Sequence, residues 1–175
     1  MHDQIAQATS TAHATQLANA PELKPLRRVD WHVVRDRVMR QGMQALFAQH
    51  PQAAAALKAT GDRPFLYKTA TDPYWGDGGD GRGLNKLSAL LQRCRALLQE
   101  CRFATAPVTT PCDAASRAGT DGAGSRDPVA FYEKGEPFYE LTNFFKAPIL
   151  VEGLWYATSE NYFQAQKYGC WKART

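Results

Sequence analysis

Two long amphipathic patterns constrain the fold of this chain more than any other feature. From Leu84 to Cys101, leucine or cysteine recurs at positions 84, 87, 91, 94, 98 and 101. Residues 30–49 carry a second apolar stripe, made by Trp31, Val34, Val38, Ala45 and Leu46. Because a period near 3.6 residues places such side chains on one face of a helix, both segments are predicted to be helices that bury one face in the core.

Shorter elements are predicted next to these helices. Asp30 is placed to cap the 30–49 helix, and Pro51 opens a short alanine-rich helix that ends at Gly61. The segment PFLYK, residues 64–68, is predicted to be a short strand that leads into a glycine-rich loop.

A linker is predicted to divide the chain. Residues 104–126 are rich in Ala, Thr, Ser, Gly and Pro, which is typical of a linker. Beyond it, residues 129–132 are predicted to form a strand, and ILVEGLWYA a hairpin that turns at Glu152–Gly153. Thr158 or Ser159 is placed to cap a final helix, SENYFQAQKYGCW.

Composition bounds the class of protein. The 175 residues are 44% hydrophobic and contain no apolar run near the roughly 18 residues that a membrane span needs, so one soluble domain is predicted. The N-terminal sequence lacks the basic and apolar regions of a secretory signal, which indicates a cytoplasmic protein. The four cysteines form no CxxC pair, so no metal site is predicted. No cofactor is expected. The formal charge of +4 suits a small anionic substrate better than an extended nucleic-acid interface.

The loop YWGDGGDGRGLNK, residues 74–86, is a candidate binding site. Its glycines, Gly76 among them, permit close backbone approaches, and Trp75 offers a flat face on which a base or sugar can stack. Asp77 and Asp80 can accept hydrogen bonds from ribose hydroxyls or stand beside a developing cation. The alternative is a polar turn whose aspartates cap the next helix and whose Trp packs; the spacing does not match a calcium-binding EF-hand loop.

The final helix carries a second candidate set. Its residues Glu160, Phe163, Gln164 and Lys167 share one face by their spacing. The carboxylate and the ammonium are about 10 Å apart along the axis, so they are expected to flank a ligand rather than to pair directly. The alternative is a solvated helix face with a charge at each end. Five cations near the other motifs are candidate phosphate contacts or ordinary surface charges: Lys24, Arg27, Arg28, Arg82 and Lys86.

Two segments resemble one known family in reversed order. LTNFFKAPILVEGLWYATSENYFQAQKY resembles the opening half of the NADAR, or YbiA-like, N-glycosidase family, with its LSNF motif, hairpin and TSEHYFQAQKF helix. The stretch from KPLRRVDW to WGDGGDGRGLNKLSALLQRCR resembles the closing half of that family. The closing half comes first here, within residues 1–102, and the opening half follows within residues 127–175.

This order predicts a circular permutation within a single domain, residues 1–175, in which the segment 103–126 joins the family's ordinary ends. The chain would then be a monomer. An exchange of halves between two chains, giving a half-swapped dimer, is the alternative arrangement. A misassembled product of tandem gene copies is a third.

The resemblance implies a fold and a function. The family has a compact α+β fold, mostly helical, around a small antiparallel sheet. Its members hydrolyse N-glycosidic bonds, either in phosphoribosylated aminopyrimidine intermediates of riboflavin synthesis or in ADP-ribosylated guanine, including guanine in nucleic acid. A nucleotide-like small molecule is therefore the expected partner. The rival hypothesis is a module that binds ADP-ribose-like ligands without turnover.

The resemblance also implies roles for individual residues. It places Glu160, Lys167, Trp75 and Asp77 at the active site, with Asn143, Phe144 and Asn85 as its lining. Glu160 and Asp77 are the candidates for the anion beside the sugar and for the base that activates water. Lys167 either donates hydrogen bonds to the substrate or attacks the opened sugar to form a Schiff base. The chain departs from the family pattern at Asn161, in place of His, and at Thr142, in place of Ser.

Overall fold

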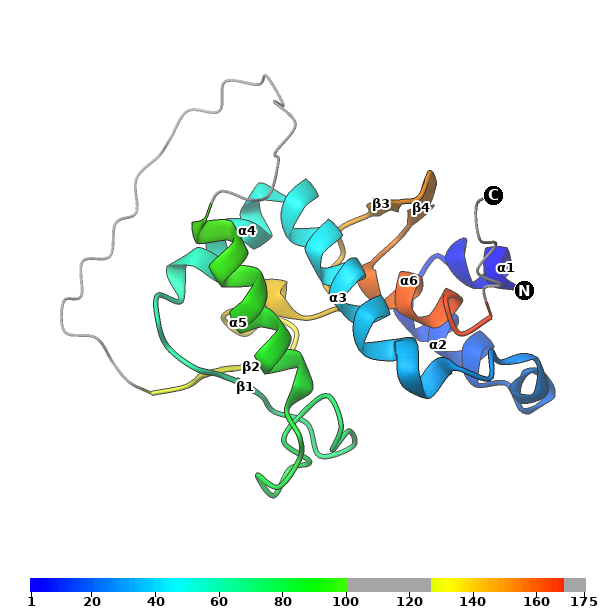
Figure 1. Ribbon diagram of the computed structural model, residues 1–175, viewed down its shortest axis with the longest axis horizontal. Coiled ribbons are helices and arrows are strands. Elements are labelled where there is room, and N and C mark those ends of the chain that lie inside the picture. The colour runs from blue at the N-terminus through cyan, green and yellow to red at the C-terminus, as the bar shows by residue number, and fades with distance from the viewer. Residues whose placement is uncertain (101–126, 169–175) are drawn as a thin grey trace.

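The computed structural model describes residues 1–100 and 127–168. Within these ranges the chain is mostly helical with short strands, which confirms the expected α+β class. Figure 1 shows α3 through the middle of the molecule, with α4 and α5 on one side and α1, α2 and α6 on the other. The elements, in order, are α1 (His2–Ala6), α2 (Thr11–Asn19), η1 (Pro21–Leu26), α3 (Trp31–Gln49), α4 (Pro51–Ala59), β1 (Phe65–Tyr67), α5 (Lys86–Gln99), β2 (Val129–Phe131), η2 (Tyr139–Leu141), β3 (Ile149–Val151), β4 (Leu154–Tyr156) and α6 (Ser159–Ala165).

The central helix α3 organises the core. Of the predicted apolar stripe, Val34, Val38 and Leu46 are buried, whereas Trp31 and Ala45 are half-buried. The helix packs against α4, α5, α6 and β3. The contact with α6 is close: a Cβ atom at Gly42 would lie 3.0 Å from Tyr162 Cδ1. A larger residue at this position would therefore push α6 away from α3.

Asp30 precedes α3 but does not cap it through its side chain, contrary to the prediction. Its carboxylate instead accepts two hydrogen bonds from Arg28, from Nε at 2.5 Å and from Nη2 at 2.8 Å. Two charge-assisted bonds to one guanidinium are stronger than a single bond to a backbone N–H, so the carboxylate turns to the arginine.

The strands form two separate pairs instead of one antiparallel sheet. β3 and β4 make the expected hairpin, with Ile149 opposite Tyr156 and positive φ angles at Glu152 and Gly153. β1 and β2 pair in parallel, with Tyr67 opposite Phe131. The parallel pair joins the segments that precede and follow residues 101–126 into one structure.

Helix α5 carries the predicted apolar face. Leu87, Leu91, Cys94 and Leu98 are buried, each Leu contributing roughly 1.5–3 kcal/mol to folding. The prediction that Leu84 belongs to this buried face is wrong, because Leu84 lies before the helix and is 63% exposed. Cys101 and the linker predicted at 103–126 lie outside the described residues.

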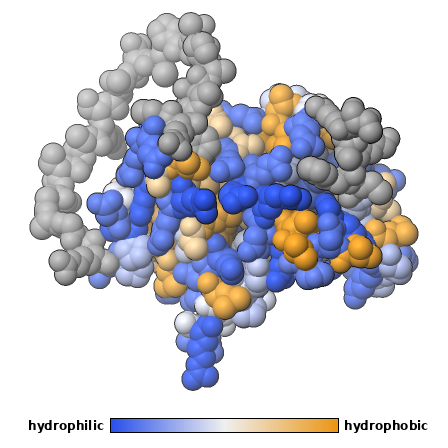
Figure 2. Space-filling model, in the orientation of Figure 1, coloured by the Kyte–Doolittle hydropathy of each residue, from blue (hydrophilic) through white to orange (hydrophobic). Residues whose placement is uncertain are grey.

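The face shown in Figure 2 is predominantly hydrophilic, with apolar side chains in small separate patches. Among the helices of residues 1–100 and 127–168, none combines the length and apolar character needed to cross a bilayer.

Candidate functional site

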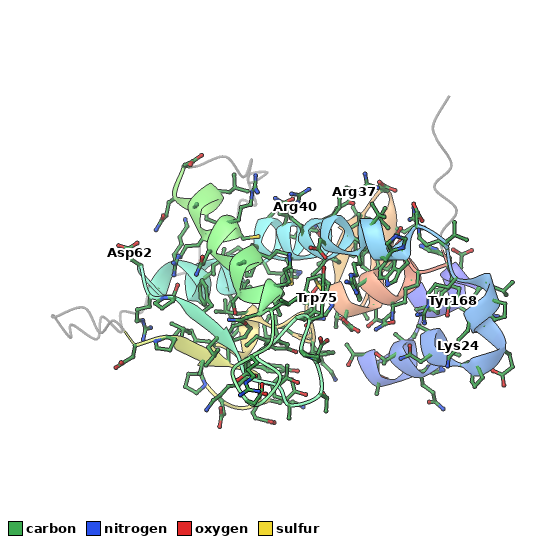
Figure 3. All side chains as sticks on the ribbon, turned by 60° about the horizontal axis from the view of Figure 1, so that its bottom comes forward. Lys24, Arg37, Arg40, Asp62, Trp75 and Tyr168 are labelled. Atoms are coloured by element: carbon green, nitrogen blue, oxygen red, sulfur yellow. The ribbon has the colours of Figure 1, made fainter. Side chains whose placement is uncertain are left out.

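A cavity of about 210 Å³ lies where α3, α6, the glycine-rich loop and the segment before β3 meet. Figure 3 shows Trp75 between this loop and α6. Five residues to which the resemblance assigns a place in the site line the cavity together: Glu160, Lys167, Trp75, Asn143 and Phe144. The other lining residues are Trp31, Arg35, Met39, Tyr67, Asp72, Leu87, Phe163 and Gln164.

The start of α6 fixes Glu160 in this cavity. Thr158 caps the helix by accepting a hydrogen bond from the Asn161 N–H at 3.1 Å, as predicted. The Glu160 N–H donates to the Asn143 carbonyl at 2.9 Å, which holds the two segments together. The carboxylate accepts from Asn143 Nδ2 and, at 2.5 Å, from Gln164 Nε2. Glu160 is thus 5% exposed and held by an amide on each oxygen.

The two amides that hold Glu160 each have an oxygen left over. Asn143 Oδ1 and Gln164 Oε1 are buried and have no hydrogen-bond partner among the described residues. Buried acceptors without partners are rare because each loses its hydration at a cost of about 1–3 kcal/mol. Together with the carboxylate they form a group of acceptors, which suits a ligand with several hydroxyl donors, such as a sugar.

Burial shifts the pKa of both charged groups in the cavity toward neutrality. It raises the pKa of Glu160 from 4.5 to about 7, opposed by the Gln164 hydrogen bond and the Lys167 charge. It lowers the pKa of Lys167 from 10.5 to about 8, opposed by the Glu160 charge. Both groups can therefore gain or lose a proton near neutral pH, as general acid–base groups require.

The raised pKa of Glu160 predicts a pH-dependent stability difference between the wild type and Glu160→Gln. The folded state favours the protonated carboxyl, so this group's contribution to stability is lost as pH rises from 4.5 to about 7. Relative to the wild type, Glu160→Gln should gain on the order of 2–3 kcal/mol over that window. Urea unfolding at pH 4.5, 6 and 7.5 measures the difference.

Glu133→Gln is the matched control, because Glu133 is exposed and lies outside the cavity. Its stability curve should run parallel to that of the wild type. A difference between Glu160→Gln and the wild type that stays constant from pH 4.5 to 7.5 would contradict the buried, raised-pKa carboxyl.

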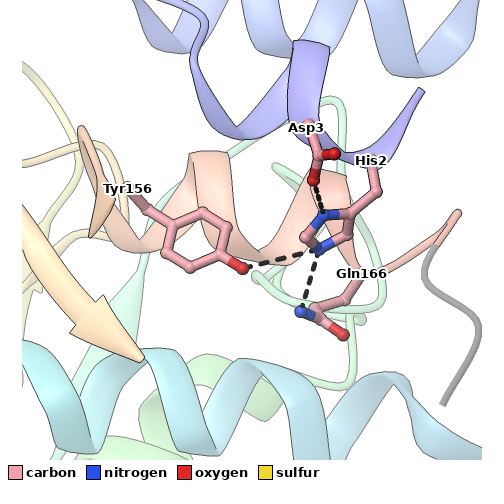
Figure 4. Close-up of polar contacts among 4 residues, drawn as sticks. All are labelled: His2, Asp3, Tyr156 and Gln166. Atoms are coloured by element: carbon pink, nitrogen blue, oxygen red, sulfur yellow. Dashed lines mark hydrogen bonds and ion pairs between the residues drawn. The ribbon is translucent and has the colours of Figure 1, made fainter. Parts of the chain in front are cut away.

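Lys167 lies just beyond α6 and is held there by the N-terminal helices. The preceding residue, Gln166, donates to His2 Nε2 at 3.3 Å, and the His2 ring lies edge-on to Tyr156 (Figure 4). The following residue, Tyr168, donates its hydroxyl to the Ala18 carbonyl at 2.6 Å. Helices α1 and α2 thus fix both neighbours of Lys167.

Aromatic rings surround the ammonium of Lys167. Its Nζ lies 5.6 Å from the Phe163 ring centre and 6.0 Å from that of Trp31, within the range of cation–π attraction. Trp75 meets Phe163 edge-on at 5.7 Å. The wall beside the lysine is therefore apolar and aromatic, which suits the flat face of a base or sugar.

The glycine-rich loop is more firmly held than its composition suggests. The Asp77 N–H donates to the Tyr67 carbonyl at 3.0 Å, and Leu87 N–H donates to the Trp75 carbonyl at 3.1 Å. A Cβ atom at Gly76 would lie 2.2 Å from Thr69 Cγ2 and 2.7 Å from the Tyr67 carbonyl oxygen. The absence of a side chain at Gly76 lets the loop pack against the end of β1. Gly76, a predicted binding residue, is not among the lining residues of the cavity.

Asp77, a predicted catalytic residue, is not among the residues that line the cavity. Its Oδ1 accepts hydrogen bonds from the N–H groups of Thr69, at 2.8 Å, and Gly79, at 3.1 Å. These bonds hold the pKa of Asp77 below its ordinary value of 3.8. A carboxylate so stabilised as an anion braces the loop and is a poor base.

Three further predicted site residues lie outside the cavity lining. Asn85 braces the loop, accepting from the Tyr67 N–H at 3.1 Å and donating to the Phe65 carbonyl at 3.2 Å. Asp80 is exposed and accepts from the Arg82 N–H. Arg27 donates to the Ala18 carbonyl at 3.4 Å, and its charge acts on Lys167 from outside the lining.

Asn161, which stands where the family pattern has His, has a structural role. Its Nδ2 donates to the Ala8 carbonyl at 2.8 Å, so the side chain ties α6 to the segment between α1 and α2. Asn161 is not among the lining residues, and the carboxylate–amide group does not depend on it.

Sequence reasoning missed Arg35 and Asp72, which both line the cavity. The Arg35 guanidinium lies 3.5 Å from the ring centre of Tyr74, whose hydroxyl donates to Asp36. Arg35 Nε is buried and without a partner among the described residues. Arg35 lies four positions after Trp31, so the two residues share one face of α3. This spacing is the sequence signal that could have placed Arg35 in the site.

Asp72 accepts hydrogen bonds from the N–H groups of Tyr74 and Trp75, at 3.0 and 2.9 Å.

A second, larger hollow of about 850 Å³ shares only Phe144 with the cavity. Thr9, Lys134, Tyr139 and Lys146 are among its lining residues. It contains none of the carboxylate, amides or lysine described above, so the smaller cavity is the candidate site.

No group of three or more His, Cys, Asp or Glu in residues 1–100 and 127–168 is arranged to hold a metal ion. Burial raises the pKa of the Cys94 thiol to about 12, which keeps it protonated. The chemistry available in the cavity is that of two carboxyls, Glu160 and Asp72, one amine, one guanidinium and hydrogen-bonding side chains.

Comparison with known proteins gives partial matches. The chain is 44% identical to N-glycosidase YbiA of Escherichia coli (strain K12) over 75 residues, 43% of this chain and 46% of that protein. It is 36% identical to a riboflavin biosynthesis protein of Vibrio vulnificus (strain YJ016) over 100 residues, 57% of this chain and 27% of that protein. It is 35% identical to an N-glycosidase of Nostoc punctiforme over 72 residues, 41% of this chain and 46% of that protein.

The chain spans about half the length, 46%, of the first curated relatives that it matches. No solved structure matches it. The model of the NADAR domain matches residues 1–99, the part that carries α3, the glycine-rich loop and α5. This chain belongs to the NADAR domain family.

Proposed function

We propose that this chain is an N-glycosidase, which hydrolyses the ribosyl C–N bond of a nucleotide-like substrate. The observation that carries the proposal is the buried Glu160 carboxyl, held by Asn143 and Gln164 in a cavity that also contains Lys167 and Trp75. Relatives named N-glycosidase support the reaction class.

The proposed reaction divides the work among these residues. As the C–N bond breaks, positive charge develops at the anomeric carbon, and the Glu160 carboxylate stabilises it. The bonding electron pair goes to the nitrogen of the base, which takes a proton from the Lys167 ammonium. Water adds to the anomeric carbon and gives its proton to Glu160. Asp72, rather than Asp77, is the second carboxyl in the cavity.

The residues that line the cavity also favour a substrate that contains a ribose, a base and a phosphate. The unpartnered oxygens of Asn143 and Gln164 are placed to accept from ribose hydroxyls, and Trp75 to stack on the base. Arg35 adds a cation for a phosphate. A phosphoribosylaminopyrimidine fits these features, and the relative named for riboflavin biosynthesis supports it; ADP-ribosylated guanine is the second candidate.

A base-release assay tests the proposal. The purified chain is incubated with a phosphoribosylaminopyrimidine, with ADP-ribosylated guanosine and with ADP-ribose, and free base is measured by chromatography. Release from at least one of the first two is expected. Calorimetric binding without release would make the chain a nucleotide-binding module instead.

We further propose that one chain forms the site by itself, with the family's halves in permuted order. The support is that Trp75 and Glu160, from opposite sides of residues 101–126, line one cavity within a single chain. Light scattering should therefore give a monomeric mass that does not change with dilution, with base release intact. A mass that doubles at high protein concentration, with activity lost on dilution, would indicate exchange of halves between two chains.

A further inference from the structure

Tyr67, at the end of β1, is a buried residue in the cavity that the proposed reaction does not yet use. Its backbone is fixed on both sides. The N–H donates to Asn85 Oδ1 at 3.1 Å and to Ser88 Oγ at 3.2 Å, and the carbonyl accepts from the Asp77 N–H at 3.0 Å. The start of α5 and the glycine-rich loop thus place this residue.

Neighbouring aromatic rings fix the side chain of Tyr67. Its ring packs against Phe131 with ring centres 5.2 Å apart, and edge-on against Tyr132 at 5.4 Å. Only 4% of the residue is exposed. The ring is therefore preorganised, and little conformational freedom would be lost on binding a ligand.

The hydroxyl of Tyr67 has no hydrogen-bond partner among the described residues, and its oxygen is not one of the fully buried unpaired atoms, so it keeps accessible surface at the cavity that Tyr67 lines. Burial, together with the nearby charges of Tyr132, Glu160 and Asp72, raises the pKa of this phenol above its ordinary value. The group is therefore a neutral O–H donor at any physiological pH.

We infer that the Tyr67 hydroxyl donates a hydrogen bond to the base of the substrate. The inference rests on the proposed function, and it completes the division of the cavity by chemistry. Glu160, Asn143 and Gln164 offer acceptors, which suit sugar hydroxyls, whereas a carbonyl oxygen on a pyrimidine or guanine base requires a donor. When the C–N bond breaks, negative charge spreads to that oxygen, and the hydroxyl stabilises it while keeping its proton.

Tyr67→Phe tests the inference, because it removes the hydroxyl and keeps the ring. Titration calorimetry compares uridine 5′-monophosphate, which has a base, with ribose 5-phosphate, which has none. The variant should bind the nucleotide about ten-fold more weakly and ribose 5-phosphate as the wild type does. Tyr132→Phe, a neighbouring ring outside the lining, should leave both affinities unchanged.

Kinetics add a second measurement. With a substrate that the wild type hydrolyses, Tyr67→Phe should lower kcat about 10²-fold with little change in KM, because the bond strengthens as charge develops. The inference is overturned if the wild type and Tyr67→Phe bind the nucleotide equally, if the wild type does not bind it, or if both ligands lose affinity together. A wild type that binds the nucleotide through Tyr67 but releases no base refutes the proposed function and leaves the inference standing.

Discussion

Glu160→Gln is expected to lower kcat for base release by roughly 10³-fold or more. An amide cannot carry the negative charge that stabilises the anomeric carbon, nor take the proton of the attacking water. Chromatographic measurement of free base under saturating substrate gives kcat directly. The loss should appear in kcat rather than in KM, since the charge is needed in the transition state.

The fold should survive this change because the surroundings can adapt to an amide. The carboxylate accepts from Asn143 Nδ2 and Gln164 Nε2, and each of these amides has an unpartnered oxygen. Rotation of either amide by 180° offers that oxygen to the new N–H groups. Glu133→Gln, an exposed control, should keep full activity. If Glu160→Gln remains folded and turns over at the wild-type rate, Glu160 is not the catalytic carboxylate.

The long elements of the fold were predictable because their signal is local. In α3 and α5 the buried positions recur at helical spacing, so the sequence alone reveals which face enters the core. Helices α1 and α2 carry no such pattern: their buried residues are Ile5 and three alanines, whose burial depends on the contact with α6. The parallel pairing of β1 with β2 involves strands of three residues each, too short for periodicity to indicate a partner.

The site was predictable where spacing or residue type is decisive. Glu160 and Lys167 lie seven positions apart in the sequence, and both line the same cavity as Trp75. Asp72 and Asp77 cannot be told apart by residue type, since both are aspartates in the segment between β1 and α5. Only the position of the Thr69 and Gly79 N–H groups shows that Asp77 braces the loop, while Asp72 borders the cavity.

Base release is expected to show a narrow bell-shaped pH profile, because the two cavity groups must be oppositely charged. The acidic limb should lie near the Glu160 pKa of about 7, below which the carboxyl is protonated. The alkaline limb should lie near the Lys167 pKa of about 8, above which the ammonium can no longer protonate the departing base. Lys167→Met should lower kcat about 10²-fold and remove the alkaline limb. Initial rates between pH 5.5 and 10 measure both effects.

The pH profile, together with borohydride trapping, shows whether Lys167 acts as a proton donor or as a nucleophile. A nucleophilic amine would make the rate rise through pH 8, and borohydride added during turnover would trap a covalent adduct, visible as a mass increase on a peptide that contains Lys167. We expect a falling rate and no adduct, because a pKa of about 8 beside the Glu160 charge leaves Lys167 mostly an ammonium at neutral pH, which is not a nucleophile. Lys58→Met, an exposed lysine on α4, is the control and should leave the profile unchanged. A trapped adduct in the wild type that is lost in Lys167→Met would replace direct hydrolysis with the imine route.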